Sequence, residues 1–178
     1  MDVDVTIADT SVFNKGTASF ATSFFGNENR IMFTSARENG VIVDEEQKSE
    51  FLCDIYWSER ESGGEWGAAK NFGRPLNSAQ HDGASAVNNT NVIYYTRWSD
   101  DNQKSKSIYL ARMQNFKFFE AYKLGPKVNV EGYKSQQPFV SMDGKTLFFS
   151  SDRPGGNGGF DIWKIEIDSL GQVVGDPQ

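Results

Sequence analysis

Few side chains in this 178-residue sequence are of the types that perform catalysis. The chain has one cysteine, Cys53, and one histidine, His81. A thiolate nucleophile needs a nearby base, but Cys53 begins an apolar segment and His81 falls in a linker, so we expect Cys53 to be a small buried residue. One histidine and one cysteine cannot build a zinc site, and no GxSxG or HExxH motif occurs. We therefore expect no enzyme, no cofactor and no transition-metal centre.

One glycine-rich loop has side chains with oxygen atoms in it or next to it in the sequence. Asp152, Asn157 and Asp161 lie in or beside the segment PGGNGG, residues 154–159. Hard cations such as Ca²⁺ take ligands of this kind, but the spacing matches no EF-hand. A phosphate-binding loop would be followed by a helix N-terminus, whereas Phe160 begins a strand-like run. The sequence therefore leaves calcium binding open at this loop and argues against phosphate.

Three strand-like segments position this loop. Asp143-Gly144 is a strong hairpin signal between Phe139–Met142 and Thr146–Ser151, and Phe160–Ile167 follows the loop. Alternate side chains of the last segment are expected on opposite faces of a strand, with Trp163, Ile165 and Ile167 against Ile162, Lys164 and Glu166. The pattern predicts a three-stranded antiparallel meander.

The meander occurs three times along the chain. Leu147–Arg153 (LFFSSDR) matches Ile93–Ser99 (IYYTRWS) and Ile31–Arg37 (IMFTSAR). The third strands match as well, as DIWKI from Asp161, SIYLA from Ser107 and DIYWS from Asp54. The copies are about 54 residues apart. The first copy also carries an insertion in the polar segment 38–50, ENGVIVDEEQKSE, as a surface loop tolerates.

A fourth strand precedes each of two recurring linkers. Glu65–Phe72 leads into NFGRPLN, and Asn115–Leu124 leads into KLGPKVN. Four antiparallel strands repeated every ~54 residues are typical of a β-propeller, whereas a sandwich or barrel needs no self-similarity. The sequence thus predicts an all-β segment of about three four-stranded antiparallel β-propeller blades over residues 1–178. The repeats are expected near 1–62, 63–115 and 116–168, with the start of a further strand at 169–178.

Both ends of the chain resemble outer strands of incomplete blades. Val3–Asp9 alternates as a lone fourth strand of a preceding blade would. Gly171–Gln178 is expected to begin another fourth strand. Propellers close with about four to eight blades, so three cannot form a ring. The sequence favours a piece of a larger propeller, whose remaining blades belong to the same longer chain, over a ring assembled from additional copies.

The segment SMDGKTLFFSSDRPGGNGGFDIWK resembles the WD40-like β-propeller repeat of the TolB type. The linker LGPKVN and the loop PGGNGGFDIW are most similar to versions in Bacteroidetes-type cell-envelope proteins, which often carry an OmpA-like domain and include a component of type IX secretion. The resemblance implies a non-catalytic scaffold in the periplasm, associated with the outer membrane. It also implies that Asp152 and Asp161 hydrogen-bond loop backbone.

Composition excludes several partner classes. The net charge is −6 and the pI about 4.8, which argues against nucleic acid, whose binders are basic. No run approaches the 18 apolar residues that indicate a membrane span. The acidic residues Asp44, Glu45 and Glu46 are expected to be a solvated surface. Other envelope proteins remain the expected partners.

Six residues on predicted loops are the candidates for partner binding, since binding residues concentrate on loops of rigid scaffolds and Trp and Arg are common in hot spots. They are Arg37, His81, Arg97, Trp98, Arg153 and Asn157. The alternative is that Arg37 and Arg153, which occupy equivalent repeat positions, belong to the structural framework. The competing function is a carbohydrate-active propeller enzyme, a glycosidase or polysaccharide lyase. It is disfavoured because the innermost strands ASFATSFF, GASAVNN and QPFVSMD bring no His or Glu to the axis.

Overall fold

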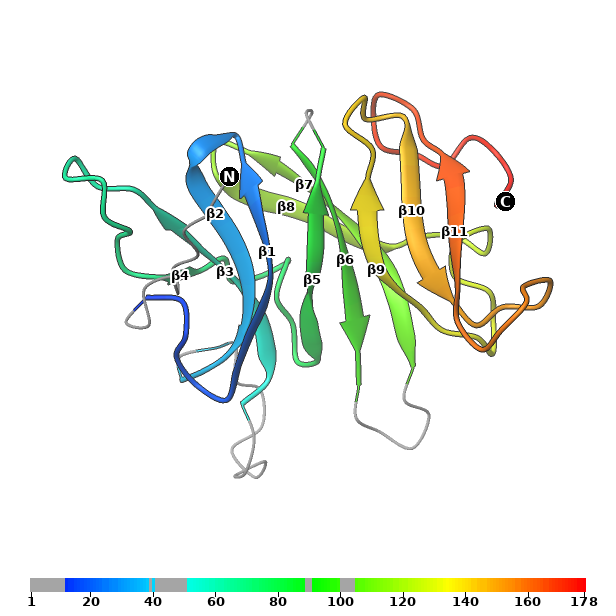
Figure 1. Ribbon diagram of the computed structural model, residues 1–178, viewed down its shortest axis with the longest axis horizontal. Helices are drawn as coiled ribbons and strands as arrows, with labels where there is room; N and C mark the ends of the chain where they lie inside the picture. The colour runs from blue at the N-terminus through cyan, green and yellow to red at the C-terminus, as the bar shows by residue number, and fades with distance from the viewer. Residues whose placement is uncertain (1–11, 39, 41–50, 89–90, 100–104) are drawn as a thin grey trace, which may run out of the picture.

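The computed structural model describes residues 12–38, 40, 51–88, 91–99 and 105–178. These residues form eleven β-strands and no helix, arranged in three antiparallel sheets (Figure 1). The predicted all-β class is confirmed. Val3–Asp9 and the acidic residues 44–46 lie outside the described residues.

Within each sheet, neighbouring strands are also consecutive in the sequence. Sheet I contains β1 (Ala18–Phe25), β2 (Asn27–Ala36), β3 (Cys53–Glu59) and β4 (Lys70–Asn71). Sheet II contains β5 (His81–Val87), β6 (Val92–Trp98), β7 (Lys106–Gln114) and β8 (Lys117–Lys123). Sheet III contains β9 (Ser135–Val140), β10 (Thr146–Ser151) and β11 (Asp161–Glu166).

The C-terminal segment extends sheet III beyond β11. Ile167 forms an antiparallel bridge with Val173. Lys164 and Gln178 exchange two backbone hydrogen bonds, with N–O distances of 3.0 and 2.9 Å. The segment therefore lies where β4 and β8 lie in the other sheets, as expected for the start of an outer strand.

Several predicted strand boundaries were wrong. β8 and β11 differ from the prediction by one or two residues at each end, and β9 begins at Ser135 rather than Phe139. β9 ends at Val140 rather than Met142, because Ser141 already belongs to the turn: its carbonyl accepts from Gly144 N–H at 2.9 Å. In sheet I the predicted strand Glu65–Phe72 is reduced to β4, while Trp66 makes only an isolated bridge with Arg60. By contrast β10 has the predicted bounds, and Ile165 and Ile167 are buried opposite an exposed Ile162.

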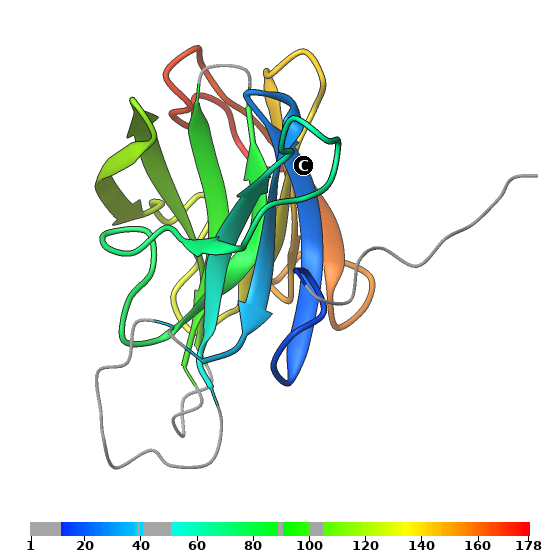
Figure 2. The same ribbon diagram turned by 90° about the vertical axis from the view of Figure 1, so that its left-hand side faces the viewer.

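The three sheets follow one another along the longest axis of the molecule, and β1, β5 and β9 lie side by side (Figure 1). Viewed along that axis, sheet I lies in front of the other two (Figure 2). Apolar clusters fill both layers between sheets. Met32 and Ile55 of sheet I pack with Ile93 and Tyr95 of sheet II. The other face of sheet II packs on sheet III, through the residues Tyr94, Ile108, Leu110, Leu147, Phe149 and Ile165.

Each first strand contains the same irregularity. The register of pairing shifts within β1, β5 and β9. At the shift, Ala21, Ala84 and Gln137 have φ of 53°, 48° and 53°. A non-glycine residue rarely adopts this region, so its recurrence indicates that the surroundings hold it there.

The bulges lock neighbouring sheets together. Ala84 N–H donates to Thr34 Oγ1 of sheet I at 2.9 Å, and Gln137 N–H donates to Thr96 Oγ1 of sheet II at the same distance. A Cβ on Gly83 would lie 2.4 Å from the Thr34 methyl group, so only glycine permits this approach. The second and third sheets are thus attached to their predecessors by one repeated contact.

Candidate binding surfaces

An arginine at the end of β2 connects sheet I to the segment before it. Arg37 donates to the carbonyls of Val12 at 2.9 Å and Phe13 at 2.6 Å. Its guanidinium carbon lies 5.1 Å from the Phe33 ring centre and 5.0 Å from that of Tyr56. Burial lowers the pKa of Arg37. The side chain is buried and held by the chain's own backbone.

Sheet III contains the same arrangement. Arg153 donates to the carbonyls of Lys127, at 2.7 Å, and Val128. Its guanidinium lies over Phe149 at 4.7 Å and over Trp163 at 5.2 Å. Phe149 and Trp163 stand where sheet I has Phe33 and Tyr56. Burial lowers the pKa of Arg153 as well.

In sheet II, the arginine that contacts the preceding linker stands at a different repeat position. Arg97 lies two residues earlier in the repeat than Arg37 and Arg153, yet it donates to the equivalent linker carbonyl, that of Leu76, at 3.1 Å. Its guanidinium lies over Tyr109 at 4.5 Å and over Tyr95 at 5.5 Å. All three arginines therefore tie a sheet to the linker that precedes it, which favours the framework interpretation. Partner binding by them stays a prediction.

Arg97 differs in having a carboxylate partner. It forms an ion pair with the fully buried Asp82 at 2.6 Å, and Asp82 also accepts from the N–H and hydroxyl of Ser78, both at 2.7 Å. Burial raises the pKa of Asp82 to about 6, although Arg97 opposes the shift. Burial acts to lower the pKa of Arg97, but the charge and hydrogen bond of Asp82 together with Tyr95 and Tyr109 outweigh burial and raise the pKa. Both groups are charged at neutral pH.

The prediction that His81, Arg97 and Trp98 lie on loops was wrong, because His81 begins β5 and the other two end β6. The structure brings His81 together with Cys53 and Trp98. The Cys53 backbone N–H donates to His81 Nδ1 at 3.0 Å. The imidazole stacks on the Trp98 indole, with ring centres 5.1 Å apart and an interplanar angle of 8°. The histidine thus contacts the backbone of Cys53 rather than its thiol. Trp98, at the end of β6, is half-buried. The contact holds β3 of sheet I to β5 of sheet II.

The two aspartates beside the glycine-rich loop accept hydrogen bonds from backbone N–H groups. Asp161 Oδ2 accepts from the backbone N–H of Asn157 at 3.1 Å and Gly158 at 3.2 Å. Asp152 Oδ1 accepts from Lys134 N–H at 2.6 Å. These bonds are of the kind that the resemblance implies. In the described ranges no group of three His, Cys, Asp or Glu side chains is placed to hold a metal. Asn157 is exposed.

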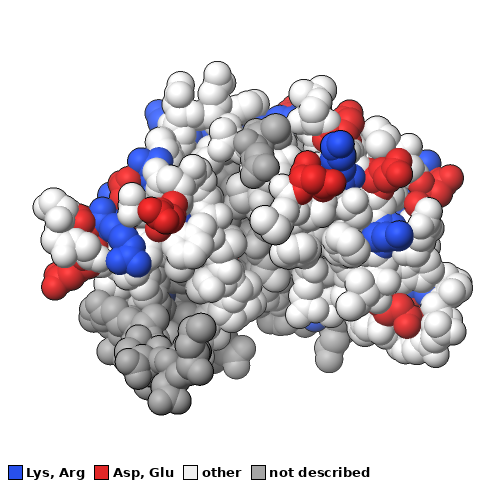
Figure 3. All heavy atoms as spheres, turned by 45° about the horizontal axis from the view of Figure 1, so that its top comes forward, with Lys and Arg blue, Asp and Glu red and all other residues white. Residues whose placement is uncertain are grey.

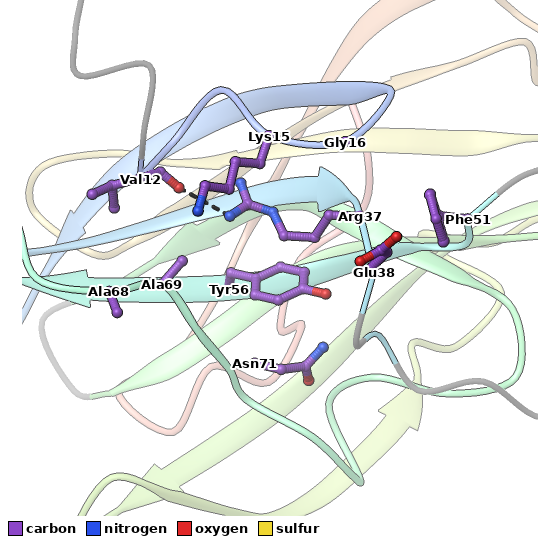
Figure 4. A pocket seen from close by; sticks show the side chains of 10 residues that line it. All are labelled: Val12, Lys15, Gly16, Arg37, Glu38, Phe51, Tyr56, Ala68, Ala69 and Asn71. Carbon is purple, nitrogen blue, oxygen red and sulfur yellow. Dashed lines mark hydrogen bonds between the residues drawn. The ribbon is translucent and has the colours of Figure 1, made fainter.

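One hollow lies on sheet I, on the face turned away from sheet II (Figure 4). Its volume is about 930 Å³. It is lined by Val12, Lys15, Gly16, Arg37, Glu38, Phe51, Tyr56, Ala68, Ala69 and Asn71. Arg37 and Tyr56 are buried, whereas Lys15 and Glu38 are exposed. Burial raises the pKa of Tyr56, so its hydroxyl stays protonated at neutral pH.

A smaller groove lies where the three first strands meet. Its volume is about 210 Å³, and it is lined by Phe20, Ala84, Thr96, Trp98, Lys106, Gln136 and Gln137. Phe20 is 40% exposed and Trp98 half-buried, so two aromatic rings are accessible there. Lys106 is its one charged lining residue among those the structure describes. We call it the first-strand groove.

Charge is not segregated on the face shown in Figure 3, where lysine and arginine are intermixed with aspartate and glutamate. A nucleic-acid site would need a continuous basic area. No helix in the described part of the chain is long and apolar enough to cross a membrane.

Sequence reasoning missed a linker asparagine that joins successive sheets. Asn77 accepts from Ile55 N–H at 2.8 Å and donates to Ile55 O at 3.0 Å. Asn129 makes the same two bonds with Ile108, both at 2.8 Å. The recurrence of asparagine at the end of NFGRPLN and KLGPKVN was the available signal, but a sequence does not show which strand the amide contacts.

Comparison with known proteins assigns no family to this chain: no protein-family model matches it, and no curated protein matches its sequence.

Proposed function

We propose that this chain is a segment of a β-propeller that acts as a non-catalytic, protein-binding scaffold of the bacterial periplasm, associated with the outer membrane. The propeller is supported by the order of strands within each sheet, by the adjacency of β1, β5 and β9, and by the repeated contacts between successive sheets. Innermost strands that lie side by side are a feature of propeller blades. The envelope location rests on the resemblance of the repeat.

The observation that carries the binding proposal is the first-strand groove. It combines Phe20, Trp98 and Lys106, and β6, which carries Trp98, is joined to sheet III by the bond from Gln137 N–H to Thr96 Oγ1. Accessible aromatic residues on a rigid support are typical anchors for a protein partner. A groove of about 210 Å³ fits one or two side chains of a partner.

The same groove disfavours the carbohydrate-active alternative. Most glycoside hydrolases use a pair of carboxyl groups flanking the scissile bond. The described lining of the first-strand groove contains no carboxylate. A scaffold therefore accounts for the arrangement better than a glycosidase.

Capture from a cell-envelope extract tests the proposal. Phe20→Ala and Trp98→Ala are expected to lose a partner that the unaltered protein retains. Phe119→Ala is the matched control, because Phe119 is an aromatic residue 59% exposed on β8, away from the groove. Thermal melts check that each variant is folded. Equal capture by all four proteins would contradict binding at the groove, and recovery of the native protein only in the cytosolic fraction would contradict the location.

A further inference from the structure

Sheet III exposes an apolar face on the side turned away from sheet II. Leu147 and Phe149 of β10 are buried against sheet II, so Phe148 between them points the other way. Phe148 lies beside Phe139, with ring centres 6.3 Å apart, and Phe139 is 60% exposed. On β11, Ile162 is 80% exposed. We call the set Phe139, Phe148, Ser150 and Ile162 the open face.

The equivalent positions in the other two sheets are covered. Ile55 of β3 and Ile108 of β7 occupy the repeat position of Ile162, and both are 0% exposed. Met32 and Tyr94 occupy the position of Phe148 and are fully buried. The open face is therefore the third copy of a surface that is an interface twice within this chain.

The same elements cover this surface at both interfaces within the chain, namely the first strand of the next sheet and the linker before it. A bulged first strand donates an N–H to a threonine of the preceding sheet, Ala84 to Thr34 and Gln137 to Thr96. Ser150 stands at the repeat position of these threonines and also carries a hydroxyl. A linker asparagine then bonds the isoleucine of the third strand, as Asn77 and Asn129 do.

Sheet I carries the complement of the open face. Ala21 of β1 has the bulge conformation, with φ of 53°. The segment Val12-Phe13-Asn14 precedes β1 as Pro75-Leu76-Asn77 precedes β5, and Arg37 bonds its carbonyls as Arg97 and Arg153 bond those of the later linkers. Phe13, Phe33 and Tyr56 already pack together there. The receiving half of a third interface is thus assembled.

We propose that the open face of one copy of this chain packs against sheet I of a second copy, head to tail, so that additional copies take the place that the sequence pattern gives to further blades of a longer chain. In this arrangement the Ala21 N–H of one copy donates to Ser150 Oγ of the other, and Ile162 lies beneath the 12–14 linker. The contact joins two different surfaces, so it closes into a ring or continues as a chain of molecules. The described residues of two copies supply six sheets, within the range of about four to eight in propellers.

Mass in solution tests the association. The unaltered protein is expected to shift, as its concentration rises, from the 19.9 kDa of one chain towards about twice that mass or more in light scattering. Ile162→Lys is expected to stay at the mass of one chain, because it places a charge in the centre of the contact. Phe119→Lys, at an aromatic residue of β8 that is 59% exposed, should associate like the unaltered protein. An unaltered protein of 19.9 kDa at every concentration overturns the inference.

Cross-linking tests the orientation. Ser150→Cys and Ala21→Cys are prepared with different tags and mixed under oxidising conditions, the native Cys53 being buried. The expected product is a disulfide-linked pair carrying both tags. A pair formed only between two Ser150→Cys chains would mean that open faces meet each other, and absence of both products would exclude the contact; either result overturns the inference. Capture by the first-strand groove is measured separately, so a monomer would leave the proposed function standing.

Discussion

The arginines of sheets II and III do the same structural task in different electrostatic settings. Arg153 bonds two linker carbonyls and two serine hydroxyls, and no carboxylate bonds it within the described residues. Arg97 bonds a linker carbonyl and the buried Asp82. One interface thus buries a cation against neutral oxygens, and the other buries an ion pair. The repeats therefore share the contact from guanidinium to linker carbonyl, although the arginine that makes it does not stand at one repeat position.

Removing each arginine should separate the two settings most clearly. Arg97→Met leaves Asp82 buried without its cation and is expected to reduce the free energy of unfolding by about 3–5 kcal/mol. Arg153→Met leaves only carbonyl and hydroxyl oxygens without a donor, for an expected loss of about 1–3 kcal/mol. Urea unfolding of both variants measures the difference. Equal losses would show that the ion pair adds nothing to the shared contact.

The pH dependence of stability should also distinguish sheet II. The pKa of Asp82 is raised to about 6 in the folded protein from 3.8, so between these values the fold holds a proton that the unfolded chain has released. This contribution to stability is present in full below about pH 4 and is lost as the pH rises through about 6, by up to roughly 3 kcal/mol.

The measurement is the difference in free energy of unfolding between the unaltered protein and Asp82→Asn across this range. We expect the difference to fall as the pH rises. A difference that grows with pH would mean that attraction to Arg97 outweighs the burial of Asp82.

The linker asparagines provide a comparison in which the two interfaces should agree. Asn77→Ala and Asn129→Ala each remove two bonds to a buried isoleucine backbone, so each is expected to cost about 1–3 kcal/mol. Thermal or urea unfolding of the pair checks this. A loss at one site only would show that the two inter-sheet contacts are not energetically equivalent.

The smallest expected effect is at the threonines that accept the bulge N–H groups. Thr34→Val and Thr96→Val keep the side-chain shape but remove the acceptor for Ala84 or Gln137, at an expected cost of about 1 kcal/mol each. Hydrogen exchange at the Ala84 and Gln137 amides provides the local measurement. Unchanged protection of both amides would show that these bonds do not hold the first strands.

Much of the fold could be predicted because strand pattern and turn chemistry are local. The Thr146–Ser151 strand and the alternating faces of β11 follow from side-chain period and from the Asp143-Gly144 turn. Of the candidate site, the sequence identified Trp98, which lines the first-strand groove, and the equivalence of Arg37 with Arg153. It did not indicate Phe20 or Lys106, because the groove forms only where β1 meets the ends of β6 and β7.

By itself the sequence determined that the chain is all-β and that one four-strand pattern recurs, since both depend on the order of residues along a single strand or turn. Only the tertiary structure decided which residues join the sheets. Arg97 contacts the linker from a different repeat position than Arg37 and Arg153, and His81 stacks on Trp98. Thr34 and Thr96 accept hydrogen bonds from the bulged first strands. These contacts connect residues far apart in the chain, and their partners are chosen by how twisted sheets approach one another, which no local pattern records.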